Sequence, residues 1–514
     1  LIDPLLSAFF CRRRSPAVGD LLPPAIPCRP AADRLFTASA SVLKRDMVTY
    51  DENDGLFIAD PDTIPLSYLP SPASVREASR DLILSASGWR KVFAENGDEE
   101  SFSETPPPED IVIAATAAVA ISEVLLGDFS RTGDRTATAA GSEPGSVTGP
   151  ATGPSAAATP TVAVAVDSRP TGPAIADAIC RCLIARGIAV RYLFISPAPE
   201  IMAYVKTNPA LHGFIYVSAS HNPVGHNGLK FGLSDGAVAG GELSRRAIDS
   251  FTRLVAEEEV VERARDMLNS GTGDEYLRVL EEIPKWKAEA SEAYTRFTLR
   301  VASGSNDAEE IDAFSTRLRR ALEEYPVGIL AELNGSARSR SIEGELLRSL
   351  GARYSSVNDR PRRIIHPIVP EGRNLEDCKN ELTAQRKEDP AFLLGYVPDN
   401  DGDRGNIVYY DEVEDTAKAV EAQEVFALSV LAELADLRSR VDAAAPAAVV
   451  INGPTSMRIE HIAELLSVEV YRTETGEANV VSRAQELRRR GYTVRILGEG
   501  SNGGNITHPA TVRD

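Results

Sequence analysis

Two short polar stretches of this chain carry residues that can do chemistry. Residues 218–223 read Ser-Ala-Ser-His-Asn-Pro and offer a hydroxyl nucleophile beside a histidine. Residues 399–404 read Asp-Asn-Asp-Gly-Asp-Arg and place three carboxylates next to an arginine. A serine that carries phosphate and a carboxylate cluster that holds a divalent cation are the two halves of a phosphoryl-transfer site. Because the two stretches are far apart in sequence, a fold must bring them together.

The serine stretch allows two interpretations. A serine hydroxyl is a poor nucleophile unless it is positioned and relieved of its proton, and His221 and Lys230 are nearby groups that can help. The stretch also fits a simple turn, because Ser, Asn and Pro all favour turns. It does not match the Gly-x-Ser-x-Gly elbow of hydrolases.

The aspartate stretch predicts a cation site. Asp399, Asp401 and Asp403 alternate, so their carboxylates can converge on one cation if the loop curls. Hard carboxylate oxygens suit Mg²⁺, which prefers to share its coordination sphere with phosphate oxygen. An EF-hand calcium loop needs Gly at position 6 and Glu at position 12, whereas this stretch has Arg404 and Tyr410 there. A solvated acidic turn is the remaining alternative.

A third polar loop, 498–504, is rich in glycine and contains Glu499 and Ser501. A carboxylate and a hydroxyl at this spacing can hold two sugar hydroxyls by directional hydrogen bonds. By itself this loop is also compatible with an ordinary connection between elements.

The elements around these loops predict an α/β fold. Apolar β-branched runs alternate with helical patterns, which implies mostly parallel sheets covered on both faces. Ligands bind at the carboxyl ends of such strands, where all three loops lie. The strands are expected at 161–166, 188–195, 213–217, 327–333, 392–397, 447–451, 468–472 and 493–497. The helices between them are expected at 172–185, 342–350, 419–437, 456–466 and 478–489.

The length predicts several consecutive domains. We expect a loose extension over 1–45, a first domain over 46–325 with the serine loop, a second over 326–418 with the aspartate loop, and a third over 419–514 with the glycine-rich loop. Within the first domain, 127–160 is almost all Gly, Ser, Thr, Ala and Pro, which predicts a disordered insertion. Residues 241–322 predict two or three helices with a break at 271–273.

The composition excludes several classes of protein. The chain has 514 residues and a net charge of −20, which argues against nucleic acid or an anionic membrane surface as partner, since both need a basic face. Five scattered cysteines form no disulfide framework and predict buried, reduced thiols of a cytoplasmic protein. We find no apolar run that approaches the ~20 residues needed to span a membrane.

Taken together, the motifs resemble those of the α-D-phosphohexomutase superfamily, the phosphoglucomutase and phosphomannomutase group. Residues 218–223 with the Asn-Gly-Leu-Lys of 227–230 resemble its phosphoserine loop, 399–404 its metal loop and 498–504 its sugar-recognition loop. Weaker matches are 87–90 (Ser-Gly-Trp-Arg), 166–173, 333–335 and 471–476. The matches run in the same order as in the family, from about residue 80 to the end. The resemblance implies three consecutive α/β domains of mixed or parallel sheets.

The resemblance also implies a mechanism in which hexose 1-phosphate and hexose 6-phosphate interconvert through a hexose 1,6-bisphosphate. Phosphorylated Ser220 gives its phosphoryl group to the sugar phosphate, and the bisphosphate returns the other one. The roles implied for individual residues are metal ligation by Ser220, Asp399, Asp401 and Asp403 around Mg²⁺; proton movement by Lys230 with His221; phosphate binding by Arg404; and substrate binding by Arg90, Arg169, Glu499 and Ser501.

The sequence departs from the family pattern at three places. Lys91 replaces the glycine usual after the Arg90 position, and Asn502 stands where glycine is common in the sugar loop. The family's fourth domain, with its Arg-x-Ser-Gly-Thr phosphate loop, is missing from the 514 residues, so we expect this chain by itself to be a poor mutase. A non-catalytic protein that binds sugar phosphates, or an inactive fragment, is the alternative function. The sequence does not distinguish glucose, mannose and amino sugars, nor does it give the oligomeric state.

Overall fold

The structure, a computed structural model, describes residues 42–45, 48–51, 53–85, 88–139, 159–440, 445–500 and 504–508. The chain divides into two compact units. One comprises Val42–Ala422 and holds the serine and aspartate loops, and the other contains Gln423–Asp514 and holds the glycine-rich loop. The residues from 1 to 41 lie outside the described residues. The last four of the predicted loose extension form strand β1 (Val42–Arg45), which pairs antiparallel with β2 (Val48–Asp51), and β2 pairs with β3 (Phe57–Ala59).

The first large sheet has six strands in the order β4-β5-β9-β8-β6-β7. The apolar β-branched runs form β6, β7 and β8, which are parallel, whereas β9 runs antiparallel to both β8 and β5. The bounds are β4 Ile83–Ser85, β5 Gly88–Val92, β6 Thr161–Val166, β7 Ala189–Ile195, β8 Gly213–Val217 and β9 His226–Leu233. The expectation of a mixed α/β fold is therefore confirmed, with β6 and β8 at the predicted positions.

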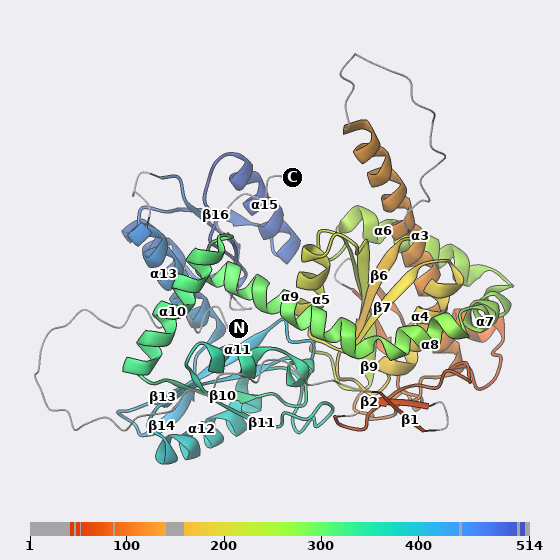
Figure 1. The fold of residues 1–514 in the computed structure, drawn as a ribbon, viewed down its shortest axis with the longest axis horizontal. Helices are drawn as coiled ribbons and strands as arrows, with labels where there is room; N and C mark the ends of the chain where they lie inside the picture. The colour runs from red at the N-terminus through yellow and green to blue at the C-terminus, as the bar shows by residue number, and fades with distance from the viewer. Residues whose placement is uncertain are drawn as a thin grey trace, which may run out of the picture. The chain divides into compact units, whose positions relative to one another are not determined.

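Helices cover both faces of this sheet, which explains why β6 is apolar throughout. On one face Val162, Val164 and Val166 pack with α3 (Pro108–Ala139) and α4 (Gly172–Ala185). On the other face Ala163 and Ala165 pack with α5 (Ala198–Thr207) and α9 (Ile283–Ser303). The long α9 and α5 lie together in front of the sheet in Figure 1.

Two predictions are wrong at helix α3. Its segment Pro108–Gly127 has the length and hydropathy of a membrane-crossing helix, contrary to our expectation, but 83% of that apolar window is buried within the fold. The sequence search for uninterrupted apolar runs missed it because acidic and hydroxyl side chains interrupt the run. The helix also continues to Ala139, into the predicted insertion 127–160, since extending an existing helix avoids the cost of nucleation. Residues 140–158 lie outside the described residues.

The predicted helical segment 241–322 contains more helices than expected. They are α6 (Gly241–Ala256), α7 (Val260–Ser270), α8 (Asp274–Glu281), α9 and α10 (Ala308–Glu324). The predicted break is present, because α7 ends at Ser270 and α8 begins at Asp274. A side chain at Gly271 would place its Cβ 1.9 Å from the carbonyl oxygen of Arg181 on α4. Close approach of the backbones therefore requires glycine at this break.

The second large sheet carries the aspartate loop. Its five strands have the order β11-β10-β12-β13-β14, with β10, β11 and β12 parallel and the last two antiparallel. The strands are β10 Gly328–Glu332, β11 Arg353–Val357, β12 Phe392–Pro398, β13 Gly405–Asp411 and β14 Thr416–Ala419. Helices α11 (Glu343–Ser349) and α12 (Glu376–Glu388) and the short 3₁₀ helices η2 (Ala337–Arg340) and η3 (Gly372–Leu375) complete this part.

The C-terminal unit repeats the pattern with a four-stranded sheet of order β16-β15-β17-β18. Its strands are β15 Ala448–Asn452, β16 Glu469–Thr473, β17 Ile496–Gly498 and β18 Asn505–Ile506. Its helices are α13 Ala422–Arg440, α14 Arg458–Leu465 and α15 Glu477–Arg489. The predicted elements of this region are present, with bounds shifted by up to three residues.

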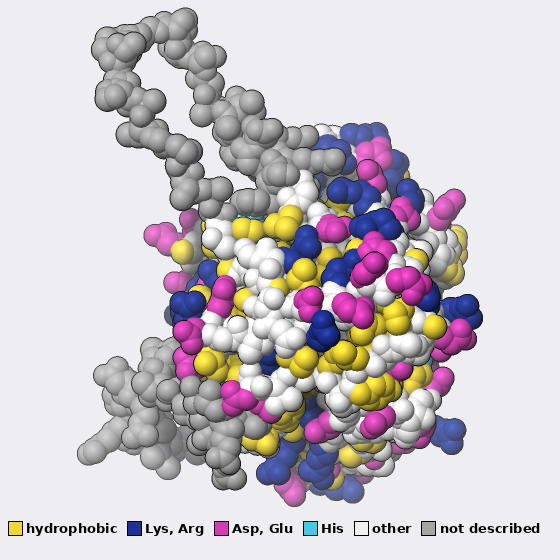
Figure 2. Space-filling view, turned by 90° about the vertical axis from the view of Figure 1, so that its right-hand side faces the viewer, with side chains coloured by type: hydrophobic (Ala, Val, Ile, Leu, Met, Phe, Trp, Pro, Cys, Tyr) yellow, Lys and Arg dark blue, Asp and Glu magenta, His cyan; other side chains and the backbone are white. Residues whose placement is uncertain are grey.

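The surface carries charges of both signs. Figure 2 shows acidic and basic side chains interspersed on one face of the molecule, with small apolar areas between them.

We expect Gly228→Ala to destabilise the first unit strongly. Gly228 lies on β9 opposite Arg90, and a Cβ there would come 1.9 Å from the carbonyl oxygen of Trp89. Since this atom is backbone, the strands must move apart, which we expect to cost about 3 kcal/mol or more. Calorimetric unfolding measures the shift. Gly241→Ala, where nothing lies within 4 Å of the new Cβ, is the control and should leave the transition unchanged; equal behaviour of the two variants would contradict the packing described.

Candidate active site

Ser220 lies in a strained turn directly after buried strand β8. Its φ of 54° is in the left-handed region that non-glycine residues rarely adopt. The Ser220 backbone N–H donates to Ser218 Oγ at 2.9 Å, and the N–H of Ser218 donates to the Gly228 carbonyl at 2.9 Å. Strain of this kind persists where the surroundings fix the backbone, which is common at functional sites. The turn is therefore built to hold one hydroxyl in one place.

Arg169, expected to bind substrate, is instead fully buried beneath the serine turn. Its guanidinium pairs with Asp167, and Nη2 donates to the carbonyl oxygens of Ser220, at 2.8 Å, and Asn222, at 2.5 Å. In this structure the guanidinium is engaged by Asp167 and by the two carbonyls of the serine turn, which its hydrogen bonds hold in place.

The three aspartates lie on the loop between β12 and β13, as the sequence predicted. Their carboxylates provide ligand atoms that all lie within 4.8 Å of one another. Asp399 and Asp401 are fully buried, and Asp403 is partly exposed. Asp401 Oδ1 has no hydrogen-bond partner among the described residues. An unsatisfied buried carboxylate oxygen beside two further carboxylates fits a hard divalent cation such as Mg²⁺.

The fold brings the serine turn to this loop. Ser220 Oγ lies 3.3 Å from Asp399 Oδ2, and Ser218 Oγ lies 3.3 Å from Asp401 Oδ2. Residues 220 and 399 lie in loops that follow strands of two different sheets, β8 and β12. The tertiary fold therefore brings them into contact. The hydroxyl is therefore placed at the edge of the carboxylate cluster, where a phosphate on it would meet a bound cation.

Two cations complete the polar surroundings. Lys230 on β9 donates from Nζ to Asp401 Oδ2 at 2.7 Å and lies 3.3 Å from Asp403. Arg404 donates from Nη2 to Ser220 Oγ at 2.9 Å and also contacts Nδ1 of His221. The structure thus brings together Ser220, His221, Lys230, Arg404 and the three aspartates, all of them candidates from the sequence.

The charges of the cluster shift its titration. Burial and the neighbouring carboxylates raise the pKa of Asp399 well above its usual range. Although burial opposes ionisation, the Lys230 ammonium lowers the pKa of Asp401. Burial likewise disfavours the charged form of Lys230, but the carboxylates of Asp401 and Asp403 outweigh it and raise the pKa of Lys230 far above the ordinary value. Burial, and then the positive charge of Arg404, lower the pKa of His221, which is therefore neutral near pH 7.

Arg90 lies within electrostatic reach of this site. It is half-buried on β5. Burial of the imidazoles is the largest cause of the lowered pKa of both His221 and His226, and the positive charge of Arg90 is a smaller cause that acts in the same direction. Ser87, from the same motif, lies outside the described residues. Lys91, the departure from the family pattern, is buried and donates to Asp110 Oδ1 at 2.6 Å. The lysine is thus accommodated as an internal ion pair.

The glycine-rich loop belongs to the other unit. Glu499 Oε1 accepts from Asn452 Nδ2 at 2.8 Å and from the Gly476 backbone N–H at 2.7 Å. Thr455 extends this network by donating to Asn452. The carboxylate is therefore held in a defined orientation at the carboxyl end of β15. Ser501 and Asn502 lie outside the described residues.

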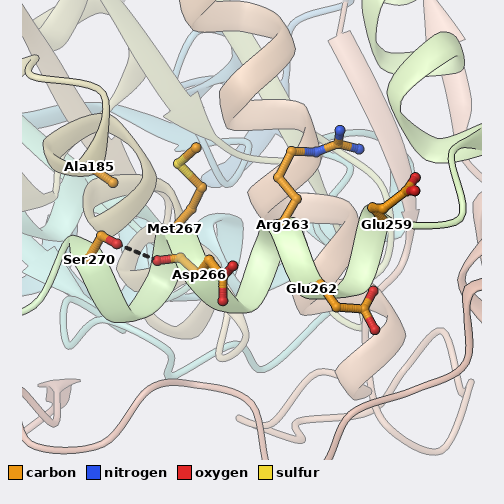
Figure 3. Close-up of a pocket in the computed structure, with 7 residues that line it drawn as sticks. All are labelled: Ala185, Glu259, Glu262, Arg263, Asp266, Met267 and Ser270. Atoms are coloured by element: carbon orange, nitrogen blue, oxygen red, sulfur yellow. Dashed lines mark hydrogen bonds between the residues drawn. The ribbon is translucent and has the colours of Figure 1, made fainter.

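A depression elsewhere on the first unit does not suit a phosphate. It has a volume of about 450 Å³ and lies beside α7, lined by Ala185, Glu259, Glu262, Arg263, Asp266, Met267 and Ser270 (Figure 3). Its one arginine, Arg263, is already paired with Glu257 and donates to the Leu254 carbonyl at 2.9 Å. Three carboxylates and an occupied arginine repel rather than bind an anion.

Two supporting residues were not predicted. Ser218 bridges the serine turn and Asp401, and Ser168 donates to Asn400 Oδ1 of the aspartate loop at 2.7 Å. Ser218 stood in the motif and could have been inferred from its position. The contact of Ser168 with Asn400 joins two distant loops, so no local pattern reveals it.

Comparisons with known proteins show which sequences this chain resembles. Residues 136–257 match the family model "Phosphoglucomutase/phosphomannomutase, alpha/beta/alpha domain I". A Methanopyrus kandleri protein named "Probable phosphoglucosamine mutase" is 26% identical over 63% of this chain and 60% of its own length. The phosphoglucosamine mutase of Lacticaseibacillus casei strain BL23 is 43% identical over 15% of this chain and 17% of its own length. The chain thus spans at most about 60% of these two relatives.

A solved structure shows the same fold. The phosphoglucomutase/phosphomannomutase family protein of Burkholderia thailandensis matches with a TM-score of 0.50 and 17% identity, over 83% of this chain and 73% of that one. At this identity the likeness concerns the fold. It agrees with the α/β domains described above.

Proposed function

Because the chain belongs to the α-D-phosphohexomutase superfamily, we propose that it is a sugar-phosphate mutase that moves a phosphoryl group between the 1- and 6-positions of a hexose. The observation that carries this proposal is the contact of Ser220 Oγ with Asp399, at 3.3 Å, and with Arg404, at 2.9 Å. A hydroxyl between a carboxylate cluster and a guanidinium is arranged for phosphoryl transfer rather than for hydrolysis by a histidine base.

In the proposed reaction, phosphorylated Ser220 transfers its phosphoryl group to a hydroxyl of a hexose monophosphate. The P–O bond to Ser220 breaks as the new bond to the sugar oxygen forms, which gives a hexose 1,6-bisphosphate. After the sugar turns over, the other phosphoryl group returns to Ser220. The same bisphosphate can therefore load the unphosphorylated protein.

The charged side chains have distinct parts in this step. The proton that the sugar hydroxyl loses passes to Ser220 Oγ as it leaves, so the step is balanced. Lys230, which contacts Asp401 and Asp403, and His221 are the groups proposed to move it. Arg404 donates to the phosphoryl oxygens from beside Ser220. Since Arg404 donates to Nδ1 of His221, the neutral imidazole carries its proton on Nε2 and can donate to the same phosphate.

The aspartate cluster fits Mg²⁺, with Asp399, Asp401 and Asp403 and an oxygen of phosphorylated Ser220 as ligands. When bound, the ion supplies neutralisation of the charge that develops on the phosphoryl oxygens. The chain's own carboxylates alone would repel a phosphate at this position.

The substrate is a sugar phosphate, which we propose is recognised through Glu499 and Ser501 for its hydroxyls and Arg90 for its phosphate. The relatives are named phosphoglucosamine mutases, so an amino sugar is the first substrate to test. The described cysteines, Cys180, Cys182 and Cys378, are free and buried, which favours a reducing compartment such as the cytoplasm.

For Arg169 we propose positioning of the serine turn in place of substrate binding. Arg169→Lys keeps the charge but loses the planar fork in which one nitrogen donates to Asp167 and another to the two carbonyls. We expect phosphoryl transfer to slow about 10²-fold, as a displacement near 1 Å costs, with KM for the sugar phosphate little changed. A large rise in KM with an unchanged kcat would instead restore the substrate-binding role.

The proposed function is tested by incubating the purified chain with Mg²⁺, catalytic hexose 1,6-bisphosphate and glucosamine 1-phosphate, glucose 1-phosphate or mannose 1-phosphate. The expected result is formation of the corresponding 6-phosphate from at least one of them. Binding of these sugars without any exchange of phosphate between sugar and protein would favour a non-catalytic sugar-phosphate-binding protein.

A further inference from the structure

The carbonyl oxygen of Gly402, at the tip of the aspartate loop, is held by a buried arginine. Arg338 on η2 donates to it from Nε at 2.8 Å and from Nη2 at 2.5 Å. The Arg338 side chain is only 3% exposed. Gly402 stands between Asp401 and Asp403, so this fork of two hydrogen bonds fixes the backbone that carries two of the three carboxylates.

The aspartate loop is held by the Arg338 side chain and by two backbone hydrogen bonds from other segments. The two preceding carbonyls accept from backbone N–H groups: Asn400 from Ala337 and Asp401 from Ala198, both at 2.9 Å. Arg338 also packs directly on Gly402, whose φ is 68°. A Cβ at Gly402 would lie 2.7 Å from Cγ and Nε of Arg338. The arginine and the glycine therefore fit each other closely.

Arg338 is in turn held by two partners on other elements. Nη1 pairs with Glu343 at the start of α11 and contacts Tyr294 Oη on α9 at 3.2 Å. All three nitrogen atoms of the guanidinium are thus hydrogen-bonded, and the Glu343 carboxylate offsets its positive charge. A buried ion pair by itself is weak evidence for a stabilising role. The two hydrogen bonds to Gly402, by contrast, point to a task at the loop.

We propose that Arg338 is a positioning residue that sets the spacing of the aspartate carboxylates for a divalent cation, and that Glu343 and Tyr294 hold it in place. The inference rests on the proposed function, in which these aspartates bind Mg²⁺. Groups that orient metal ligands without touching the metal typically change metal affinity by 10–100-fold when they are replaced. Arg338 touches no aspartate side chain among the contacts found, so its effect reaches the site through the backbone.

The test is direct binding of Mg²⁺ to the full chain, measured by isothermal titration calorimetry without substrate. We expect Arg338→Met to weaken Mg²⁺ binding by about 10–100-fold. Arg338→Lys, which keeps the charge beside Glu343 but loses the fork, should be nearly as weak. Tyr294→Phe removes one hydroxyl that holds Arg338 and should weaken binding about threefold. The matched control is Arg340→Met on the same 3₁₀ helix, because Arg340 pairs with Asp51 and Asp54 instead.

The outcomes distinguish failure of the role proposed for Arg338 from failure of the Mg²⁺ assignment. If the wild-type chain binds Mg²⁺ and folded Arg338→Met binds it equally well, the inference is wrong and the proposed function stands. If the wild-type chain binds no Mg²⁺, the metal assignment fails and the inference fails with it. Should Arg338→Met not fold, Arg338→Lys and Tyr294→Phe decide: unchanged Mg²⁺ affinity in both overturns the proposal, and graded weakening with Arg340→Met unaffected supports it.

Discussion

Replacing Ser220 with alanine is expected to abolish phosphoryl transfer. The strained turn positions Ser220 Oγ, and Asp399 and Arg404 contact it. In the proposed mechanism this oxygen forms the covalent bond to phosphorus. Loss of the nucleophile in a covalent mechanism leaves only binding and electrostatic contributions, so we expect a drop of about 10⁴-fold or more. Coupled-enzyme assay of 6-phosphate formation measures the rate.

Ser218→Ala is the matched control for this prediction. Ser218 lies two residues away on the same turn and also contacts an aspartate, but it is not expected to carry phosphate. The variant should therefore still accept a phosphate on Ser220, with a smaller loss of rate because the turn loses one hydrogen bond. Full activity in Ser220→Ala would refute the assignment of the nucleophile.

Removal of the cation site is the second change with a large expected effect. Asp401→Asn keeps the size of the side chain but removes the charge of the aspartate whose Oδ1 is buried without a partner. A bound metal ion contributes several kcal/mol of charge stabilisation. We therefore expect transfer to fall by at least about 10³-fold, and excess chelator should have a similar effect on the wild-type chain.

The control for the cation site is Asp411→Asn. Asp411 ends β13 and pairs with Lys418, and it is not one of the three clustered aspartates. Its loss should leave the rate within about twofold, since such surface pairs contribute little. Chelator-resistant turnover, or an Asp401→Asn rate equal to that of Asp411→Asn, is incompatible with a cation held by this cluster.

Much of the fold was predictable because its strands are buried on both faces. Residues 161–166 and 213–217 read as continuous apolar runs, and the structure has strands at those positions. Helix α3 was missed since its polar residues interrupt the apolar run, although they lie within a core helix. Helix ends depend on packing as well as local preference, which is why five helices replace the two or three predicted for the helical segment 241–322.

The candidate site was predictable in part. Ser220 and Asp399 each lie after a predicted strand, so a ligand site at each loop was predictable, whereas their approach across two sheets was not. The task of Arg169 was not predictable, because the sequence gives its type but not its burial beneath the turn. Arg338 stands in no recognised motif, and its contact with Gly402 spans 64 positions of the chain. Long-range contacts of this kind require the folded structure.

Phosphorylation of Ser220 is the central step of the proposed mechanism, and one measurement tests it directly. The purified chain is incubated with Mg²⁺ and a hexose 1,6-bisphosphate labelled in its phosphates, and the protein is then digested and its peptides mapped. We predict about one labelled phosphate per chain, located on Ser220, and its release to unlabelled hexose monophosphate when that is added. Label on another residue, or no label on a chain that nevertheless converts hexose phosphates, would contradict the account.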